Sequence, residues 1–475
     1  MIKELKNIIG SNKVLEDQDV LDLYSSDQSL ASSKKPSAVV KPNSVEEIQG
    51  LVQFANKTLT PLIPVSSGIH FCGATLPEQG GVVMDLSGMN KILEIDTENR
   101  RVKIEPGVTW HQLQEALKEH DQMPLNPLFP HPQTSALTGS LEGDPMLIPK
   151  YEYGDPVLSS QIVLGNGDLF KTGMASAQNT QGVYPEGPGT NFFTFFMAAQ
   201  GTMGIVTWQN LKTEYRPKEQ KVFFVAFNDL EEAAKPIYKL QRRHVGNECF
   251  VLNNLMLASL LCDGSPDEYN KLLSELPLYT LVLVIAGAPR RPLERIAYEE
   301  KALMEIAADL RFEPKKTVGG VSGLGTTMID MLRNLPAEEP FWKERIKNSS
   351  QDIFFITTMN KAQSYVDTAV GYAAGFGLTP DDIGVYMQPL ERGRACHLSF
   401  SLPCDLSDEK DRARIKELHF MLSEKLINDG AFFSRPYGTW ADMVYRRTST
   451  YTAKLKELKQ IFDPNNILNP GKLCH

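Results

Sequence analysis

A run of small residues near the N-terminus has the composition of a phosphate-binding turn. Residues 61–65 predict a strand that leads into Ser66-Ser67-Gly68, and Gly73 follows a few positions later. Small residues leave consecutive backbone N–H groups accessible, so such a turn can hold an anion and approach a pyrophosphate closely. A glycine-containing turn after a strand is more often a plain connection. This stretch by itself therefore leaves both interpretations open.

A polar face on an expected strand near residue 400 offers a candidate proton acceptor. Within residues 395–402, alternation places His397, Ser399 and Ser401 on one side and the apolar residues on the other. An imidazole with a near-neutral pKa can take a hydroxyl proton while hydride leaves the adjoining carbon. The alternative is that this face is solvated or has a purely structural role.

An arginine in an aromatic segment is the candidate anion-binding group. Arg435 lies in residues 431–440, AFFSRPYGTW, 28 positions before Asp463. Its planar guanidinium suits either a phenolate or a carboxylate. An ion pair with one of the acidic residues of the chain is the alternative, and Arg446 and Arg447 compete for the same role.

Four further stretches accompany the small-residue turn in a fixed order. They are GVVMDLSGMNKI at 81–92, VKIEPGVTW at 102–110, QGTMGIVT at 200–207 and FDPNNILNPGK at 462–472. Together with the turn, this ordered set resembles the flavoprotein family of vanillyl-alcohol oxidase, p-cresol methylhydroxylase and the FAD-linked D-lactate and glycolate dehydrogenases. The resemblance covers nearly the whole chain.

The resemblance implies an α+β fold with FAD as cofactor. A two-part p-cresol-methylhydroxylase-type (PCMH-type) FAD-binding domain would be followed by a mixed α/β cap, or substrate, domain over the isoalloxazine, and a C-terminal segment would return to the flavin. On this chain we expect an N-terminal helical segment at 1–35, the FAD-binding domain at 36–216, the cap at 217–428 and the C-terminal segment at 429–475.

The resemblance also assigns cofactor contacts. The turn at 65–70 would hold the pyrophosphate, PQTSALTGS at 132–140 looks like the second FAD-contacting segment, and Ile205 sits on the adenine side. The hydroxy-acid dehydrogenases usually continue with Asn- and Gly-rich residues, whereas this chain has LEGD at 141–144. The expected FAD contacts are Val65, Ser66, Ser67, Gly68, Ile69, His70, Thr134, Thr138, Gly139, Ser140, Ile205, Asn469 and Lys472.

Some relatives bond a histidine of the phosphate turn covalently to the flavin. His70 lies one position after the usual site, which Ile69 occupies. We therefore expect non-covalent FAD and keep a covalent link through His70 as the alternative. A histidine in this loop can also simply form a hydrogen bond.

The resemblance leaves the substrate class open. In the phenol-oxidising members an arginine beside a tyrosine steadies a phenolate, whereas Arg435 follows Ser434. In the metal-assisted hydroxy-acid dehydrogenases the strand carries a His-x-Gly-Asp-Gly-Asn-x-His pattern, of which only His397 is recognisable, so we expect no metal site. We expect His397 and Arg435 as catalytic residues, and the expected substrate contacts are Tyr386, Gln388, Arg394 and Tyr437.

The elements that must position these groups follow from hydrophobic periodicity. Residues 1–35 predict helix, and Ser44 with Glu47 forms a capping box at the start of another. After residue 217 strands alternate with helices, which is typical of a mixed α/β layer separate from the first one. Further strands are expected at 81–85, 102–104, 161–164, 168–171, 204–207, 222–227, 249–252, 278–286, 353–359, 383–388 and 395–402, and helices at 110–118, 192–199, 230–243, 254–261, 293–309, 361–374, 408–428 and 449–462.

Composition excludes several functions. The 475 residues carry 49 Lys and Arg against 58 Asp and Glu, a net charge of −9, which disfavours binding to nucleic acids or anionic membranes. The six cysteines contain no C-x-x-C spacing and make no disulfide framework, as in a reducing compartment. The longest apolar run, 278–288, is too short for a membrane span, and the N-terminus lacks a signal-type apolar stretch. We expect a cytoplasmic protein without membrane insertion.

These observations predict an FAD-dependent oxidoreductase, a dehydrogenase rather than an oxidase. It would move a hydride from a small alcohol-type substrate to flavin N5, with a phenolic or aryl alcohol favoured over a 2-hydroxy acid. The alternative is a flavin-binding electron-transfer subunit of a larger complex. The chain has no cysteine cluster or haem motif to carry electrons onward, which leaves dioxygen, a quinone-like small molecule or a separate redox protein as acceptor. The reduced cysteines and the resemblance to dehydrogenase subunits favour a redox protein, in a homo- or hetero-oligomer.

Overall fold

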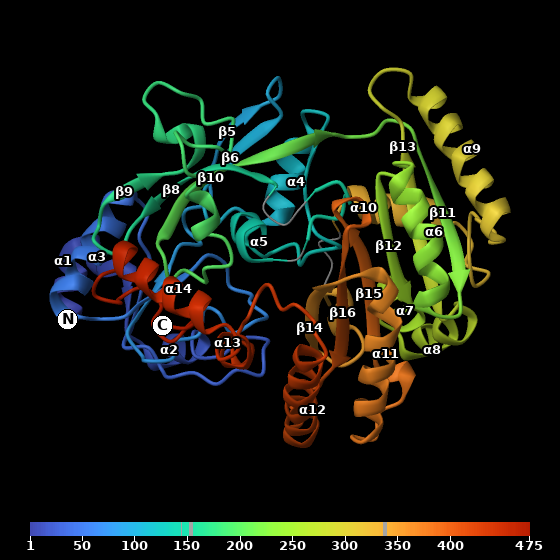
Figure 1. Ribbon diagram of the computed structural model, residues 1–475. Helices are drawn as coiled ribbons and strands as arrows, with labels where there is room; N and C mark the ends of the chain where they lie inside the picture. The colour runs from blue at the N-terminus through green and yellow to red at the C-terminus, as the bar shows by residue number, and fades with distance from the viewer. Residues whose placement is uncertain (144, 152–154, 336–339) are drawn as a thin grey trace.

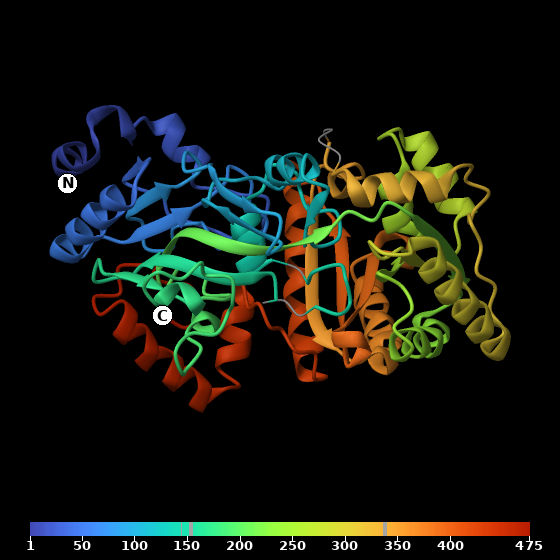
Figure 2. The ribbon, with the colours of Figure 1, turned by 90° about the horizontal axis from the view of Figure 1, so that it is seen from above.

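The computed structural model describes residues 1–143, 145–151, 155–335 and 340–475, and these form two lobes (Figure 1 and Figure 2). The chain enters the second lobe between strands β10 (Ile205–Tyr215) and β11 (Gln220–Phe227). It returns after helix α12 (Glu409–Asn428), so both termini lie in the first lobe. Within these described residues, no helix is long and apolar enough to cross a membrane.

The first lobe begins with a four-stranded sheet in the order β1 (Val14–Leu15), β2 (Ala38–Val40), β4 (Val82–Asp85), β3 (Leu62–Val65). Strands β2, β4 and β3 are parallel. The crossover from β2 to β3 is α3 (Val45–Thr58), and its N-cap Ser44 accepts from the Glu47 N–H at 3.3 Å, as the capping box predicted.

The expectation of helix throughout residues 1–35 is wrong in part. Helices α1 (Ile2–Ile9) and α2 (Gln18–Leu23) form, but the stretch that follows does not continue the helix. The backbone after α2 instead forms hydrogen bonds with the phosphate turn and the segment that follows it. The Gln28 N–H donates to the His70 oxygen, and the Lys34 N–H donates to the Pro77 oxygen.

A second sheet completes the first lobe in the order β5 (Ile92–Asp96), β6 (Arg101–Ile104), β10, β8 (Val157–Val163), β9 (Leu169–Lys171), with β7 (Gln122–Pro124) beside β10. Helices α4 (Trp110–Lys118) and α5 (Ala136–Glu142) belong to this lobe. The helix expected at 192–199 is reduced to a single 3₁₀ turn, Phe193–Phe195, where the rings of Phe170, Phe192 and Phe195 pack on one another.

The second lobe is built on an antiparallel sheet in the order β11, β13 (Tyr279–Ala286), β12 (Glu248–Asn253), β15 (Gly384–Leu390), β16 (Ala395–Pro403), β14 (Ser350–Thr357). One face packs on α6 (Leu230–Arg242), α9 (Pro292–Leu310), α11 (Met359–Ala374) and α12. The other packs on α7 (Asn254–Leu261), α8 (Pro266–Glu275) and α10 (Leu324–Arg333). The strands and helices expected after residue 217 all form, whereas α8 and α10 were not anticipated.

The C-terminal segment ties back into the first sheet. After α13 (Thr439–Tyr445) and α14 (Ser449–Phe462), Leu468 pairs with Leu62 next to β3. A buried ion pair between Lys459 and Asp463, 2.6 Å apart, fixes the turn between them. The segment that carries DPNNILNPGK therefore lies beside the strand that leads into the phosphate turn.

Candidate functional site

A cavity of about 670 Å³ lies between the two lobes, and the phosphate turn forms part of its wall. Its volume falls within the roughly 300–1,000 Å³ range of ligand and cofactor sites. Both lobes and the C-terminal segment contribute side chains. Of the expected FAD contacts, the lining residues are Ser67, Ile69, His70, Thr134, Thr138 and Gly139.

The phosphate turn is held in place by short hydrogen bonds. The Ser66 hydroxyl lies 2.6 Å from that of Thr138, which joins the turn to α5, and the His70 Nε2 lies 2.6 Å from the Ser67 carbonyl oxygen. A Cβ placed on Gly68 would meet no atom within 4 Å, so the backbone of the turn is open at this residue. These features fit the pyrophosphate of FAD, which needs small residues and accessible N–H groups.

Helix α5 forms the floor of the cavity. Its N-cap Ser135 accepts from the Thr138 N–H, and Trp110 packs so closely that a Cβ on Gly139 would come within 2.9 Å of its indole. Both Trp110 and Gly139 line the cavity. The expected contact Ser140 turns away, because its hydroxyl donates to the Ala136 carbonyl within the helix.

The remaining expected FAD contacts support the turn rather than line the cavity. Val65 and Ile205 are buried in their sheets, and Lys472 forms an ion pair with Glu78 at 2.6 Å. The Asn469 amide donates to the carbonyls of Ala74 and Gln200, which places it beside the turn. Asn469 Oδ1 has no hydrogen-bond partner among the described residues, so a donor on a bound cofactor would fit there.

Aromatic rings from both lobes form one wall of the cavity. Phe71 follows the phosphate turn, and its ring centroid lies 6.0 Å from those of His131 and of Phe341 in the second lobe. The His131 and Phe341 centroids are 4.9 Å apart. Tilted ring pairs at such distances are favourable, and they leave apolar ring faces for a planar ligand. This wall was not predicted from the sequence, because its members are far apart in the chain.

The cap and the C-terminal segment together contribute a second aromatic group. Phe354 and Trp440 line the cavity, with their rings nearly perpendicular and 5.4 Å apart. Asp352 also lines the cavity, is half-buried and pairs with Lys343. Although burial raises the pKa of Asp352, the charge of Lys343 and hydrogen bonds from Lys343, Ser401 and Ser350 hold it below its ordinary value.

The polar face of β16 is not solvated. The register places His397 beside Gln388 and Ile356, and Ser399 beside Tyr386 and Phe354, all on the face away from α11 and α12. His397 is buried and is not among the described residues of the cavity wall; the ring of Phe354, which does line the cavity, stacks on it at 5.9 Å. Burial and the nearby charge of Lys343 lower the pKa of His397 to about 3, so its imidazole is neutral near pH 7.

The expected substrate contacts are brought together only in part. Tyr437 lines the cavity. Tyr386 and Gln388 are hydrogen-bonded to each other. They contact the first lobe, because the Gln388 amide donates to the Met146 oxygen at 2.6 Å. Arg394 is on the surface, with its side chain 81% exposed and paired with Glu391, so we leave it out of the proposed site.

Arg435 is the buried arginine of the C-terminal segment, whereas its two competitors are on the surface. Arg446 pairs with Glu424 and Arg447 bonds to the Met443 oxygen. The charge of Arg435 acts on Glu142, a residue that the sequence did not single out as functional. Glu142 ends α5 and lines the cavity, and the Tyr437 hydroxyl donates to its main-chain oxygen.

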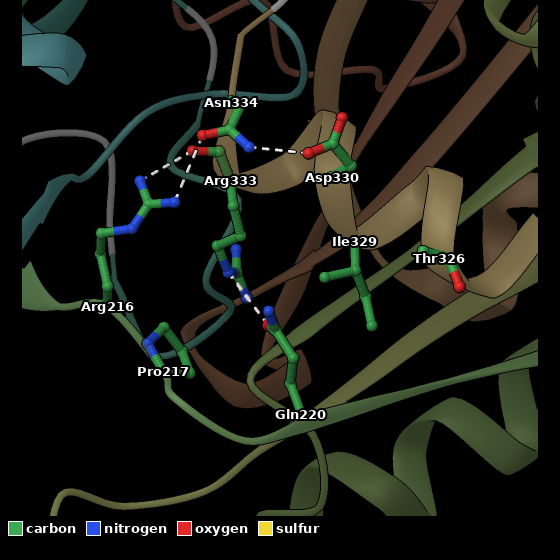
Figure 3. Close-up of a pocket in the computed structure, with 8 residues that line it drawn as sticks. All are labelled: Arg216, Pro217, Gln220, Thr326, Ile329, Asp330, Arg333 and Asn334. Atoms are coloured by element: carbon green, nitrogen blue, oxygen red, sulfur yellow. Dashed lines mark hydrogen bonds between the residues drawn. The ribbon is translucent and has the colours of Figure 1, made fainter. Parts of the chain in front are cut away.

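A second cavity of about 270 Å³ lies where β10 passes into β11 (Figure 3). Arg216 reaches across it and donates to the Arg333 oxygen at 2.9 Å and to Asn334 at 3.3 Å. Arg333 in turn donates to Gln220 and pairs with the buried Glu248 at 2.7 Å. These bonds link the two lobes at the point where the chain crosses between them.

Comparison with known proteins adds two family matches. Residues 36–173 match the FAD binding domain family, and residues 441–473 match the C-terminal domain of FAD linked oxidases. The first match contains the phosphate turn and α5, and the second contains α14 and the DPNNILNPGK segment.

Relatives and solved structures agree with these matches. The chain is 22% identical to a glycolate oxidase subunit of Bacillus subtilis, over 95% of this chain and 92% of that protein. It is 30% identical to the flavoprotein subunit of 4-cresol dehydrogenase (hydroxylating) of Pseudomonas putida, over 55% of this chain and 51% of that protein. The crystal structure of p-cresol methylhydroxylase with substrate bound has a TM-score of 0.86 at 20% identity, covering 100% of this chain and 96% of the other. This likeness confirms the predicted fold class.

Proposed function

Because the chain belongs to the FAD-linked oxidoreductases of the vanillyl-alcohol oxidase and p-cresol methylhydroxylase family, we propose that it oxidises a small alcohol-type substrate, with a phenolic or aryl alcohol favoured. FAD supplies the hydride acceptor when bound, and the protein orients the substrate, moves its proton and excludes water. The observation that carries the proposal is the cavity that continues from the phosphate turn to the aromatic residues of the cap.

The ring-rich walls favour an aromatic substrate over a small hydroxy acid. Phe71 and Phe341 on one side and Phe354 and Trp440 on the other offer apolar faces on which a planar ring can pack. Aromatic pairs contribute about 0.5–1.5 kcal/mol beyond the area that they bury, so such a wall selects for rings. A 2-hydroxy acid remains the second candidate, since the likeness to the glycolate oxidase subunit extends over nearly the whole chain.

Arg435 is not among the described residues that line the cavity, but its charge acts on Glu142, which does line it, and we propose that Arg435 holds negative charge that develops on the substrate oxygen. Arg435→Ala should lower kcat/KM by roughly 10- to 150-fold, because a buried charged hydrogen bond contributes roughly 1.5–3 kcal/mol. Steady-state kinetics with the best alcohol substrate measures the change. Arg446→Ala is the matched control, because it removes an exposed arginine that pairs with Glu424. Unchanged kinetics in Arg435→Ala would return this residue to a structural role.

We further propose that FAD is held non-covalently and that a partner takes its electrons. The His70 ring is already bonded to the Ser67 oxygen, which orients it within its own turn. Electron transfer to a separate redox protein is in keeping with relatives described as subunits, and an electron-transfer subunit without its own alcohol substrate is the rival function. The six cysteines contain no C-x-x-C spacing and make no disulfide framework, which favours a reducing compartment, and we propose the cytoplasm.

Anaerobic bleaching of the bound flavin tests the proposal. Phenolic and aryl alcohols should bleach it faster than glycolate, D-lactate and D-2-hydroxyglutarate. The reduced protein should then reoxidise slowly in oxygenated buffer and rapidly with an acceptor dye, as measured by stopped-flow absorbance. Bleaching by hydroxy acids alone would select the second candidate, bleaching by none of the alcohols would favour the rival, and fast reoxidation by air would make the protein an oxidase.

A further inference from the structure

A half-buried glutamate lies in the cavity wall on the same helix as two expected FAD contacts. Glu142 is one turn after Thr138 and Gly139 on α5, so the three residues share a helix face, and all three line the cavity. Glu142 thus points to the space between the cofactor turn and the cap. His397, the proton acceptor expected from the sequence, is outside that wall.

Groups from two other segments of the chain hold the side-chain carboxyl of Glu142 in place. The Gln200 N–H donates to its Oε1 at 2.6 Å, and the Tyr437 hydroxyl lies 3.4 Å from its Oε2 as well as bonding to its main-chain oxygen. Gln200 comes from the segment before β10 and Tyr437 from the C-terminal segment, so three separate parts of the chain fix one carboxyl group. Such support holds a proton-transfer group in a defined position.

Among the described residues, the charged and titratable groups that face Glu142 are Arg435, Tyr437 and, on α13, Tyr445, all in the C-terminal segment. Burial raises the pKa of Glu142 to about 7, and the Gln200 N–H, the charge of Arg435 and the Tyr437 hydroxyl oppose that rise. The carboxylate form therefore increases as the pH passes upward through 7. A group whose pKa is near the working pH is the most effective general base.

We propose that Glu142 is the catalytic residue that accepts the hydroxyl proton of the substrate, with Tyr437 as its positioning residue. The O–H bond breaks and its proton passes to a carboxylate oxygen of Glu142, which becomes a carboxylic acid. The electron pair of that bond forms the carbonyl π bond while the C–H bond breaks, and the hydrogen leaves with two electrons as hydride to FAD, the oxidant. This inference rests on the proposed function.

Four other titratable groups of the wall, the side chains of His70, Asp352, His419 and His131, are less suited to this role. His70 Nε2 lies 2.6 Å from the Ser67 carbonyl oxygen. Asp352 pairs with Lys343 and accepts from Ser401. The His419 ring stacks on Trp440, with Nε2 3.3 Å from the Asp352 carbonyl oxygen, and burial lowers its pKa to about 4. His131 Nδ1 accepts from the Gln133 N–H. Each of these groups is committed to a neighbour inside the wall, whereas Glu142 has a pKa in the range of neutral catalysis.

Infrared difference spectroscopy of the FAD-loaded protein between pH 5 and 9 gives a readout that does not depend on activity. The wild type should show one buried carboxyl that loses its proton near pH 7. The band should be absent in Glu142→Gln and present in Glu119→Gln, which makes the same change at an exposed carboxylate of the same lobe. In Tyr437→Phe the midpoint should move to higher pH, because the hydroxyl that lowers the pKa of Glu142 is gone.

The rate of anaerobic flavin bleaching by the best alcohol completes the test. In the wild type this rate should rise through the same midpoint, and in Tyr437→Phe the inflection should shift with the infrared band. Glu142→Gln should lose the inflection and about 10²–10⁴-fold in rate while keeping its FAD. A Glu142→Gln protein with wild-type rate and pH profile, or an infrared midpoint well away from pH 7, overturns the inference. If no alcohol bleaches the wild-type flavin, the proposed function itself fails, and the role of Glu142 fails with it.

Discussion

Gly68→Asp is expected to give a folded protein that has lost most of its FAD. Its neighbours Ser67, Ile69 and His70 line the cavity, and a side chain at Gly68 has open space around it. The substitution therefore acts on the ligand rather than on the fold. At an effective dielectric constant of about 20, a carboxylate about 4 Å from a phosphate charge costs roughly 4 kcal/mol, close to a thousandfold in Kd. The ratio of flavin to protein absorbance in the purified variant measures the loss.

Gly68→Ala separates charge from volume. The methyl group meets no neighbour within 4 Å, so this control should keep the fold and much of the FAD. Far-UV circular dichroism should be the same for both variants and the wild type. Full FAD occupancy in Gly68→Asp would show that the pyrophosphate does not bind at this turn.

Asp463→Ala is expected to lower the free energy of unfolding by about 3–5 kcal/mol, the usual effect of breaking a buried ion pair. Lys459 and Asp463 are 4% and 0% exposed, and the carboxylate also accepts the N–H groups of Ile467 and Leu468. Its removal leaves the buried Lys459 ammonium without its carboxylate, bonded to the carbonyls of Thr202 and Leu468. Urea unfolding followed by circular dichroism, with the C-terminal segment probed by proteolysis, measures the loss.

An exposed ion pair on the same helix provides the control. Lys454 and Glu457 are 72% and 62% exposed, so Glu457→Ala should cost less than about 1 kcal/mol. If the two alanine variants were equally stable, the C-terminal segment would not depend on the buried pair. A large effect confined to Asp463 would show that this pair holds the segment against β3.

Much of the fold could be read from the sequence, because its signals are local. The N-cap at Ser44 and helices 254–261 and 449–462 form where periodicity placed them. The helix expected at 192–199 did not form, because the phenylalanine rings of this stretch pack on one another in the tertiary structure. Periodicity registers apolar spacing and does not distinguish a helix face from such a cluster.

The sequence by itself determined the cofactor, through the ordered set of motifs that carries the family resemblance, and the alternation on β16, because a period of two is a property of neighbouring residues. It could not determine which polar groups reach the cavity. His397 lies one strand in from the edge and is buried, although its face of the sheet was assigned correctly. Glu142 acquires its position from Gln200 and Tyr437, which are 58 and 295 residues away. Contacts between such distant residues, and the loss of water that shifts a pKa, exist only once the two lobes and the C-terminal segment have come together.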